Sequence, residues 1–196
     1  MDLFAASTTI PGIDHRPGWL SWEEADALFN GLRDTVEWEV HRIRMFGRMV
    51  DSPRLSCWLG DEDAVYRYSG TIFEPRPWPT MLDSLRARLA AECGRPFNSV
   101  LANLYRDGRD AMGWHRDDEP ELGDAPLIAS LSLGATRRFL LKDAQGRRHA
   151  MELANGDLLS MSGDSQRRYR HALPRTAKAV GPRINLTFRN IFVHTT

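Results

Sequence analysis

The sequence predicts a mainly β fold with flanking helices, built as a sandwich or a barrel-like double sheet. Six short runs of β-type residues follow Phe97, and turn signals separate them. Two helical patterns with apolar stripes precede them. Short strands joined by short turns favour an antiparallel double sheet over a parallel α/β sheet. We therefore expect one domain over residues 1–196, with the helices packed on one outer face of the sheets.

The two helices have clear start and stop signals. Ser21 and Glu24 have the spacing of a capping box, which predicts that the first helix begins there. Thr80 is expected to open the second helix, and Gly94 is expected to end it. The apolar stripes of the two helices are formed by Leu28, Phe29, Leu32 and Val36, and by Leu82, Leu85 and Leu89.

The expected strands occupy the second half of the chain. They are read from "SVLANLY", "PLIASLSLG", "RRFLLKD", "RRHAMEL", "DLLSMSG" and "RINLTFRNIFV". The segments "DAQG" at 143–146 and "ANGD" at 154–157 are turn signals between them.

Composition limits the class of protein. Of the 196 residues, 42% are hydrophobic and 27% are charged, which is typical of globular proteins. No apolar run approaches the roughly 18 residues that cross a bilayer, and the first residues lack the pattern of a secretory signal. Cys57 and Cys93 form no CxxC pair. We expect a cytoplasmic protein, at the nucleoid in a bacterium or in the nucleus of a eukaryote, with no membrane partner.

The nine residues "GWHRDDEPE" at 113–121 hold the first sign of chemistry. His115 and Asp117 are two positions apart, so on an extended chain both side chains leave from the same face. With His171 as a third ligand, they would form the two-His, one-carboxylate triad of non-haem Fe(II) oxygenases. A solvated acidic loop is the alternative. A kinase catalytic loop is excluded, because the downstream Asn, the Gly-rich loop and the β3 lysine are missing.

The segment "RINLTFR" at 183–189 points to an anionic ligand. Arg183, Asn185, Thr187 and Arg189 alternate with apolar residues, so a strand here would have one polar face. Two buried guanidinium groups would need an anion, and a dicarboxylate suits their paired donors. An edge strand with both arginines in water is the alternative.

Four segments in this order, "NLYRDG", "HRDDE", "HALP" and "PRINLTFR", resemble the AlkB family of Fe(II)/2-oxoglutarate-dependent nucleic-acid dealkylating dioxygenases. The similarity runs from about Arg44 to Asn190 and is greatest to members that act on duplex DNA. It implies a double-stranded β-helix (jelly roll) core at 98–194. Helices and a nucleotide-recognition lid at 1–97 would form an N-terminal substrate-binding extension.

The resemblance also implies the cofactors, which are Fe(II), 2-oxoglutarate and O₂, and the residues that bind them. His115, Asp117 and His171 are the implied iron ligands. Arg189 would hold the distal carboxylate of 2-oxoglutarate, with Arg183 near the same molecule. The remaining implied cosubstrate residues are Asn103, Tyr105, Asn185 and Thr187.

The implied reaction is oxidative demethylation of N-alkylated bases such as 1-methyladenine and 3-methylcytosine, with release of formaldehyde, succinate and CO₂. The base must first be flipped out of the duplex. Phe46, Gly47 and Arg48 resemble a hairpin finger that fills the gap, although Phe46 in a core and Gly47 at a bulge would be ordinary too. Base contacts are expected from Tyr66, Arg67, Tyr68 and Asp118, and phosphate contacts from Arg48, Arg54, Arg137, Arg167, Arg168 and Arg170.

Other readings of the same residues remain. The substrate class is open between duplex DNA, single-stranded DNA and RNA, or a protein or small molecule. A catalytically silent binding protein of the same fold is a second alternative, and a zinc hydrolase is a third. We expect a monomer. Arg138 has no assigned contact, and Arg137 has no role beyond the phosphate contact considered above.

Overall fold

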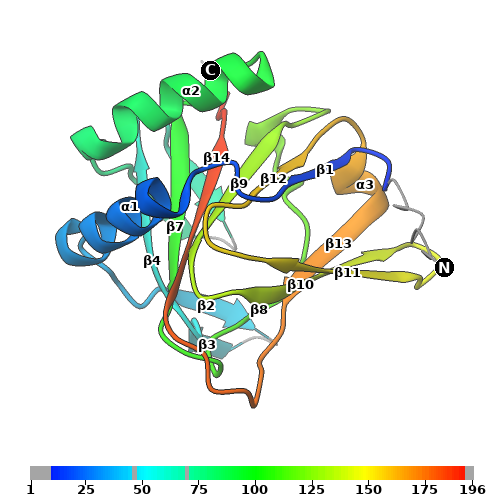
Figure 1. The fold of residues 1–196 in the computed structure, drawn as a ribbon. Coiled ribbons are helices and arrows are strands. Elements are labelled where there is room, and N and C mark those ends of the chain that lie inside the picture. The colour runs from blue at the N-terminus through cyan, green and yellow to red at the C-terminus, as the bar shows by residue number, and fades with distance from the viewer. Residues whose placement is uncertain (1–9, 46–47, 69–70, 193–196) are drawn as a thin grey trace, which may run out of the picture.

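The computed structural model describes residues 10–45, 48–68 and 71–192 of this chain. Within them the protein is mainly β with few helices, and two antiparallel sheets form its centre (Figure 1). This confirms the expected mainly β class, and the two sheets are consistent with a jelly roll. No helix of the described ranges is long and apolar enough to cross a membrane.

The larger sheet has six strands in the spatial order β1-β12-β9-β14-β7-β4. Its strands are β1 (Ile13–Arg16), β4 (Leu55–Gly60), β7 (Ser99–Tyr105), β9 (Ile128–Gly134), β12 (Leu158–Met161) and β14 (Arg183–Arg189). Every neighbouring pair is antiparallel, and β14 lies between β9 and β7. The strand with the two arginines is therefore central in this sheet, not at its edge.

The smaller sheet has four strands in the order β11-β10-β13-β8. They are β8 (Met112–His115), β10 (Arg137–Asp143), β11 (Arg148–Leu153) and β13 (Tyr169–Leu173). Two separate two-stranded ladders lie on either side of β4 in the chain. They pair β2 (Arg42–Met45) with β3 (Arg48–Asp51), and β5 (Tyr66–Tyr68) with β6 (Thr71–Phe73).

The helices begin and end largely where the sequence predicts. They are α1 (Trp22–Thr35), η1 (Thr80–Leu82), α2 (Asp83–Cys93), η2 (Pro120–Leu122) and α3 (Ser165–Arg168). The capping box at α1 is confirmed, because the Glu24 backbone N–H donates to Ser21 Oγ and the Ser21 backbone N–H donates to the Glu24 carboxylate. Gly94 ends α2 with a φ of 66°, a left-handed conformation that favours glycine.

Helices α1 and α2 both pack on the outer face of the larger sheet, as expected (Figure 1). Leu32 of α1 and Leu89 of α2 share one apolar cluster with Leu186 and Phe188 of β14. A second cluster fills the space between the sheets, with Phe139 and Leu141 on one side. Each Å² of apolar surface that these side chains remove from water stabilises the packing of the layers by about 25 cal/mol.

Some elements differ from the sequence-based prediction. The turn at 143–146 closes a hairpin between β10 and β11, whereas the turn at 154–157 leads from one sheet to the other. Strands β1 and β4 were not predicted. β4 is a short and almost fully buried run, so it lacks the alternation that identifies a half-exposed strand.

Candidate metal and dicarboxylate site

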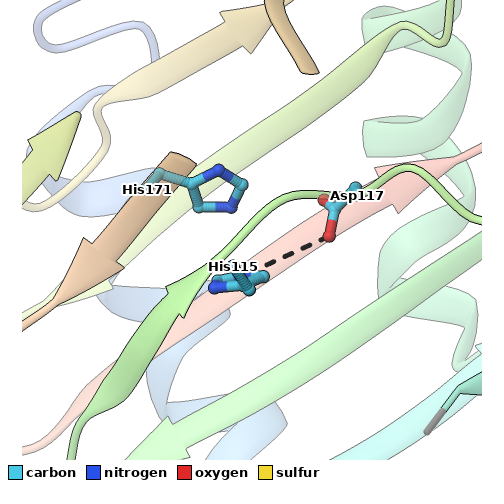
Figure 2. Close-up of side chains that lie close together, drawn as sticks. All are labelled: His115, Asp117 and His171. Carbon is cyan, nitrogen blue, oxygen red and sulfur yellow. Dashed lines mark ion pairs between the residues drawn. The ribbon is translucent and has the colours of Figure 1, made fainter. Parts of the chain in front are cut away.

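His115, Asp117 and His171 come together between the two sheets (Figure 2). Each offers one ligand atom, and these atoms all lie within 4.8 Å of one another. His115 ends β8 and His171 lies in β13, where the two residues are paired across the ladder. Their imidazole centroids are 4.1 Å apart. The pairing of two strands brings together residues that are far apart in the sequence.

The His115 ring is oriented by its own strand. Its Nδ1 lies 2.9 Å from the Gly113 carbonyl oxygen, so this nitrogen carries the proton and donates. Nε2 then keeps its lone pair, and it lies 3.9 Å from Asp117 Oδ1. Metal-binding histidines are commonly fixed by such a bond from the second ring nitrogen.

Burial and charge set the protonation of the triad. Burial lowers the pKa of His171 to about 3, with repulsion from His115 adding to the effect. The pKa of His115 is lowered as well, mainly by burial. Burial alone would raise the pKa of Asp117, but attraction to Arg189 and to both imidazoles outweighs it and gives about 2. At neutral pH the site is two neutral imidazoles and one carboxylate, a donor set that fits Fe(II).

The polar face of β14 is buried and connected by hydrogen bonds. Arg183 Nη2 donates to Asn185 Oδ1 at 2.7 Å, and Asn185 Nδ2 donates to Thr187 Oγ1 at 2.8 Å. All seven residues of the strand are buried. The opposite face packs against the helices, so the alternative of arginines in water is wrong for this strand.

Arg183 is a buried cation with unsatisfied hydrogen-bond donors. It is 1% exposed, and Nη2 bonds to Ser132 and Asn185 while Nε and Nη1 have no hydrogen-bond partner. Burial lowers the pKa of Arg183 to about 10, which leaves it charged at pH 7. Among the described residues, no acidic side chain forms an ion pair with Arg183. A carboxylate of a bound ligand would satisfy these donors, so the residues fit 2-oxoglutarate.

Arg189 lies at the metal end of the pocket. Its Nη2 donates to Asp117 Oδ2 at 3.0 Å, and both side chains are almost fully buried. Arg183 stands six positions away along β14, beside Tyr105. Arg189 is thus the arginine that contacts a triad residue, and Arg183 lies farther along the strand. The expectation that Arg189 meets the distal carboxylate of 2-oxoglutarate stays a prediction.

Asn103 and Tyr105 line the same pocket from β7. Asn103 Oδ1 accepts a bond of 2.7 Å from Arg54 Nε, which turns its amide nitrogen into the available donor. Arg54 is 6% exposed, so the expected phosphate contact is wrong and Arg54 instead orients a pocket residue. Sequence reasoning missed this role because a lone arginine in a loop gives no signal.

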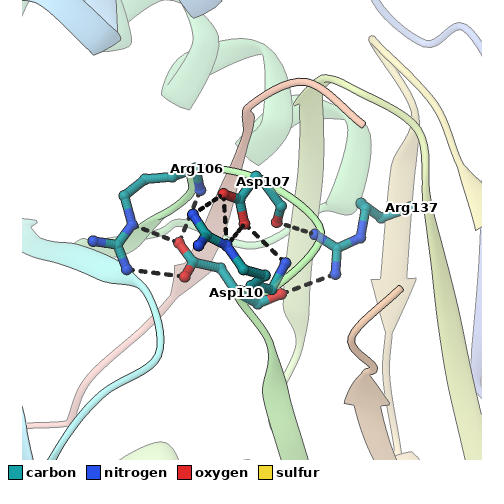
Figure 3. Close-up of polar contacts among 5 residues, drawn as sticks. Arg106, Asp107, Asp110 and Arg137 are labelled. Atoms are coloured by element: carbon teal, nitrogen blue, oxygen red, sulfur yellow. Dashed lines mark hydrogen bonds and ion pairs between the residues drawn. The ribbon is translucent and has the colours of Figure 1, made fainter. Parts of the chain in front are cut away.

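Arg137 is also buried, and its guanidinium binds backbone carbonyl oxygens (Figure 3). The expected phosphate contact is therefore wrong for Arg137 as well. Its two Nη groups donate to the carbonyl oxygens of Asp107, Asp110 and Pro174 at 2.8–3.0 Å. Its guanidinium carbon lies 5.8 Å from the Tyr105 ring centroid, and that of Arg183 lies 5.4 Å from the same centroid. Arg137 thus ties the loop after β7 to the segment after His171.

The candidate DNA contacts are described only in part. Phe46 and Gly47 lie outside the described residues, between the paired ends of β2 and β3. The backbone of β5 carries Tyr66, Arg67 and Tyr68, but the positions of their side chains are not described. Arg48 is exposed. Asp118 is exposed next to the triad and forms an ion pair with Arg116 at 2.5 Å.

Comparison with known proteins agrees with the metal and dicarboxylate site described above. The family model of the 2OG-Fe(II) oxygenase superfamily matches residues 12–189. DNA oxidative demethylase ALKBH2 of Homo sapiens is 40% identical over 182 residues, covering 87% of this chain and 70% of that protein. Alpha-ketoglutarate-dependent dioxygenase alkB homolog 3 of Homo sapiens is 37% identical over 187 residues, covering 90% and 65%.

The chain spans 65% of the length of ALKBH2 of Bos taurus, so it corresponds to about two thirds of such relatives. The solved structure of OsALKBH1 matches with a TM-score of 0.64 at 19% identity, covering 93% of this chain and 99% of that one, and it supports the fold. The matched family and the clustered triad together identify the cofactors as Fe(II) and 2-oxoglutarate. This chain belongs to the AlkB family of 2OG-Fe(II) oxygenases.

Proposed function

We propose that this protein is a DNA-repair dioxygenase that removes small alkyl groups from base nitrogens, as in 1-methyladenine and 3-methylcytosine. The observation that carries the proposal is the cluster of His115, Asp117 and His171, which lies in one pocket with Arg183. Arg183 Nε and Nη1 have no hydrogen-bond partner and could bind an anion. Similarity to proteins named DNA oxidative demethylase supports DNA as the substrate class.

When held by His115, Asp117 and His171, Fe(II) would supply oxidation by O₂ coupled to decarboxylation of 2-oxoglutarate to succinate and CO₂. One oxygen atom enters succinate and the other enters the methyl C–H bond of the base. The resulting N-hydroxymethyl group breaks its C–N bond and leaves as formaldehyde, which restores the N–H or lone pair of the base.

The chain's own groups bind and orient. His115, Asp117 and His171 hold the metal in a buried setting, with His171 also stacked on Phe139 at 5.6 Å. Arg183 would hold the distal carboxylate of 2-oxoglutarate through its Nε and Nη1, which have no other hydrogen-bond partner. The pocket is completed by Asn103, Tyr105, Asn185, Thr187 and Arg189.

In this proposal the chain is a single domain in which residues 1–97 supply the N-terminal helices and the nucleotide-recognition lid, and residues 98–194 form the catalytic core and add further DNA contacts. All four residues of β3 are exposed, including the apolar Met49 and Val50, as suits a finger that enters a duplex. Phe46 and Gly47 would lead that finger. On the base side, Asp118 is exposed beside the triad and suits a bond from an exocyclic amino group.

A groove of about 560 Å³ on the smaller sheet is a candidate binding site for a polyanion. Its exposed basic residues come from β10, β11 and the segment after β13, namely Arg138, Arg148, Arg175 and Lys178. Glu152 is the acidic residue among those lining it. Such a groove suits the phosphates of the duplex, because phosphate contacts position the nucleic acid.

The test is anaerobic loading with Fe(II) and 2-oxoglutarate, followed by air and a 1-methyladenine duplex, with formaldehyde and succinate measured together. Equal release of both supports the proposal. Succinate without formaldehyde would redirect the search to RNA or another substrate. Neither product with iron bound would favour the silent binding protein. His171→Ala should release neither product, and His15→Ala is its control, since His15 lies outside both the triad and the groove.

A further inference from the structure

One buried side chain joins the two segments that carry the metal ligands. Gln166 belongs to α3, which leads directly into β13 and His171. Its Oε1 accepts a hydrogen bond of 3.0 Å from the backbone N–H of Asp117. The residues are 49 positions apart in the chain, and Gln166 is 3% exposed.

Asp117 needs such a bond because no strand ladder holds it. Strand β8 ends at His115, and residues 116–119 have no regular structure before η2 begins at Pro120. Asp117 is 2% exposed, so its backbone N–H has no water to bond with. The hydrogen bond to Gln166 satisfies this donor and also fixes the position of the Asp117 backbone relative to His115.

Gln166 itself is held from its other end. Its Nε2 donates to Met161 Sδ at 3.5 Å, and Met161 is a residue of β12 that lines the metal pocket. Gln166 is not among the residues lining that pocket. It therefore acts on the metal through Asp117.

We propose that Gln166 is a positioning residue of the metal site, a role that rests on the proposed function in so far as the triad binds Fe(II). Asp117 is held at two points: Gln166 holds its backbone and Arg189 holds its carboxylate. Together they aim Oδ1 at the space shared with His115 and His171. Loss of Gln166 releases the backbone and lets the carboxylate leave that arrangement.

The experiment compares Gln166→Met, which keeps the unbranched shape without the amide, with Gln166→Glu, which keeps an oxygen acceptor for the Asp117 N–H. Gln145→Met is the matched control, because Gln145 is exposed in the β10–β11 turn. Mn(II) affinity of the purified proteins is measured by the electron paramagnetic resonance of the free ion. The Fe(II) concentration for half-maximal succinate release and the kcat at saturating Fe(II) are measured in parallel.

We expect Gln166→Met to weaken Mn(II) binding by about 10- to 100-fold, as for other residues that orient metal ligands. Its kcat at saturating Fe(II) should stay near the wild-type value, and Gln166→Glu should retain affinity within about threefold. Wild-type Mn(II) affinity in Gln166→Met would overturn the proposal. A loss of Mn(II) affinity in Gln166→Glu as large as the about 10- to 100-fold loss expected for Gln166→Met would overturn it as well. This measurement still tests the proposal if Gln166→Met fails to fold. A wild-type protein that binds no Mn(II) or Fe(II) would instead overturn the proposed function and this role with it.

Discussion

Arg189 donates to the carboxylate of Asp117 across 3.0 Å, from the central strand of the larger sheet to the loop that follows β8 of the smaller one. This bond joins the two sheets at the metal end of the pocket. It also places a positive charge against a metal ligand, which outweighs the effect of burial and lowers the pKa of Asp117 to about 2, so the carboxylate is ionised at neutral pH.

Replacing Arg189 by Met should make metal binding sensitive to acid. Without the guanidinium, burial raises the pKa of Asp117 toward and above its ordinary value. Mn(II) affinity should then fall more steeply between pH 7 and pH 5 than in the wild type. The unpaired buried carboxylate should also lower the free energy of unfolding by about 3–5 kcal/mol, measured by urea denaturation. A pH profile of affinity parallel to that of the wild type would contradict this assignment.

Arg183→Met should remove recognition of the distal carboxylate. Losing two charge-assisted hydrogen bonds costs about 3 kcal/mol, or ~100-fold in affinity for 2-oxoglutarate, measured by calorimetry on the Mn(II)-loaded protein. The variant should no longer prefer 2-oxoglutarate over 2-oxobutyrate, which lacks that carboxylate. The ligand-free protein should lose no stability, because a buried cation with two unpaired donors has been removed. Retained preference in Arg183→Met, with preference lost in Arg189→Met, would restore the opposite orientation.

The ligand-free protein should lose stability as the solution is acidified below pH 6.5. The pKa of His171 is about 3 in the folded protein, below its ordinary value of 6.5. Its neutral form therefore contributes stability fully above pH 6.5, and this contribution is lost as the pH falls toward 3. Urea denaturation from pH 8 to pH 4 measures the slope. His171→Gln should flatten it, and an unchanged slope would show that another group is responsible.

Arg137→Met should destabilise the fold and leave the metal ligands in place. Arg137 satisfies three backbone carbonyls, those of Asp107, Asp110 and Pro174, and none of the three residues is a metal ligand. Unmaking these bonds in a buried setting should cost about 3–5 kcal/mol in the free energy of unfolding. Arg138→Met is the matched control, since Arg138 is exposed on the same strand. Equal stability of the two variants would argue against this role.

Phe46→Ala should weaken repair of duplex DNA more than repair of single strands. A duplex base must be unstacked before it reaches the metal, and a wedge side chain offsets part of that cost. We expect about a tenfold loss in kcat/KM on a 1-methyladenine duplex and little change on the single strand. Phe192→Ala serves as the control, because Phe192 is an exposed aromatic residue after β14. Equal losses on both substrates would remove Phe46 from the finger.

Much of the local structure follows from the sequence. The capping box at Ser21 and the glycine at 94 specify helix ends through bonds within a few residues. The alternation in "RINLTFR" specifies a strand with one polar face, since the pleat repeats every two residues. The His-x-Asp spacing places two ligands on one side of an extended chain, although Gln166 and Arg189 hold Asp117 in place in the folded protein.

Other features depend on pairings between distant segments. Only the β8–β13 ladder places His171 beside His115, and only the central position of β14 buries Arg183 and Arg189. The order of the arginines, with Arg189 at the metal and Arg183 beyond it, follows from which end of β14 meets the loop after β8. The roles of Gln166, Arg54 and Arg137 are of the same kind. The identity of a glutamine or an arginine does not reveal whether it lies on the surface or in the core. Tertiary packing decides which backbone or side-chain group it contacts.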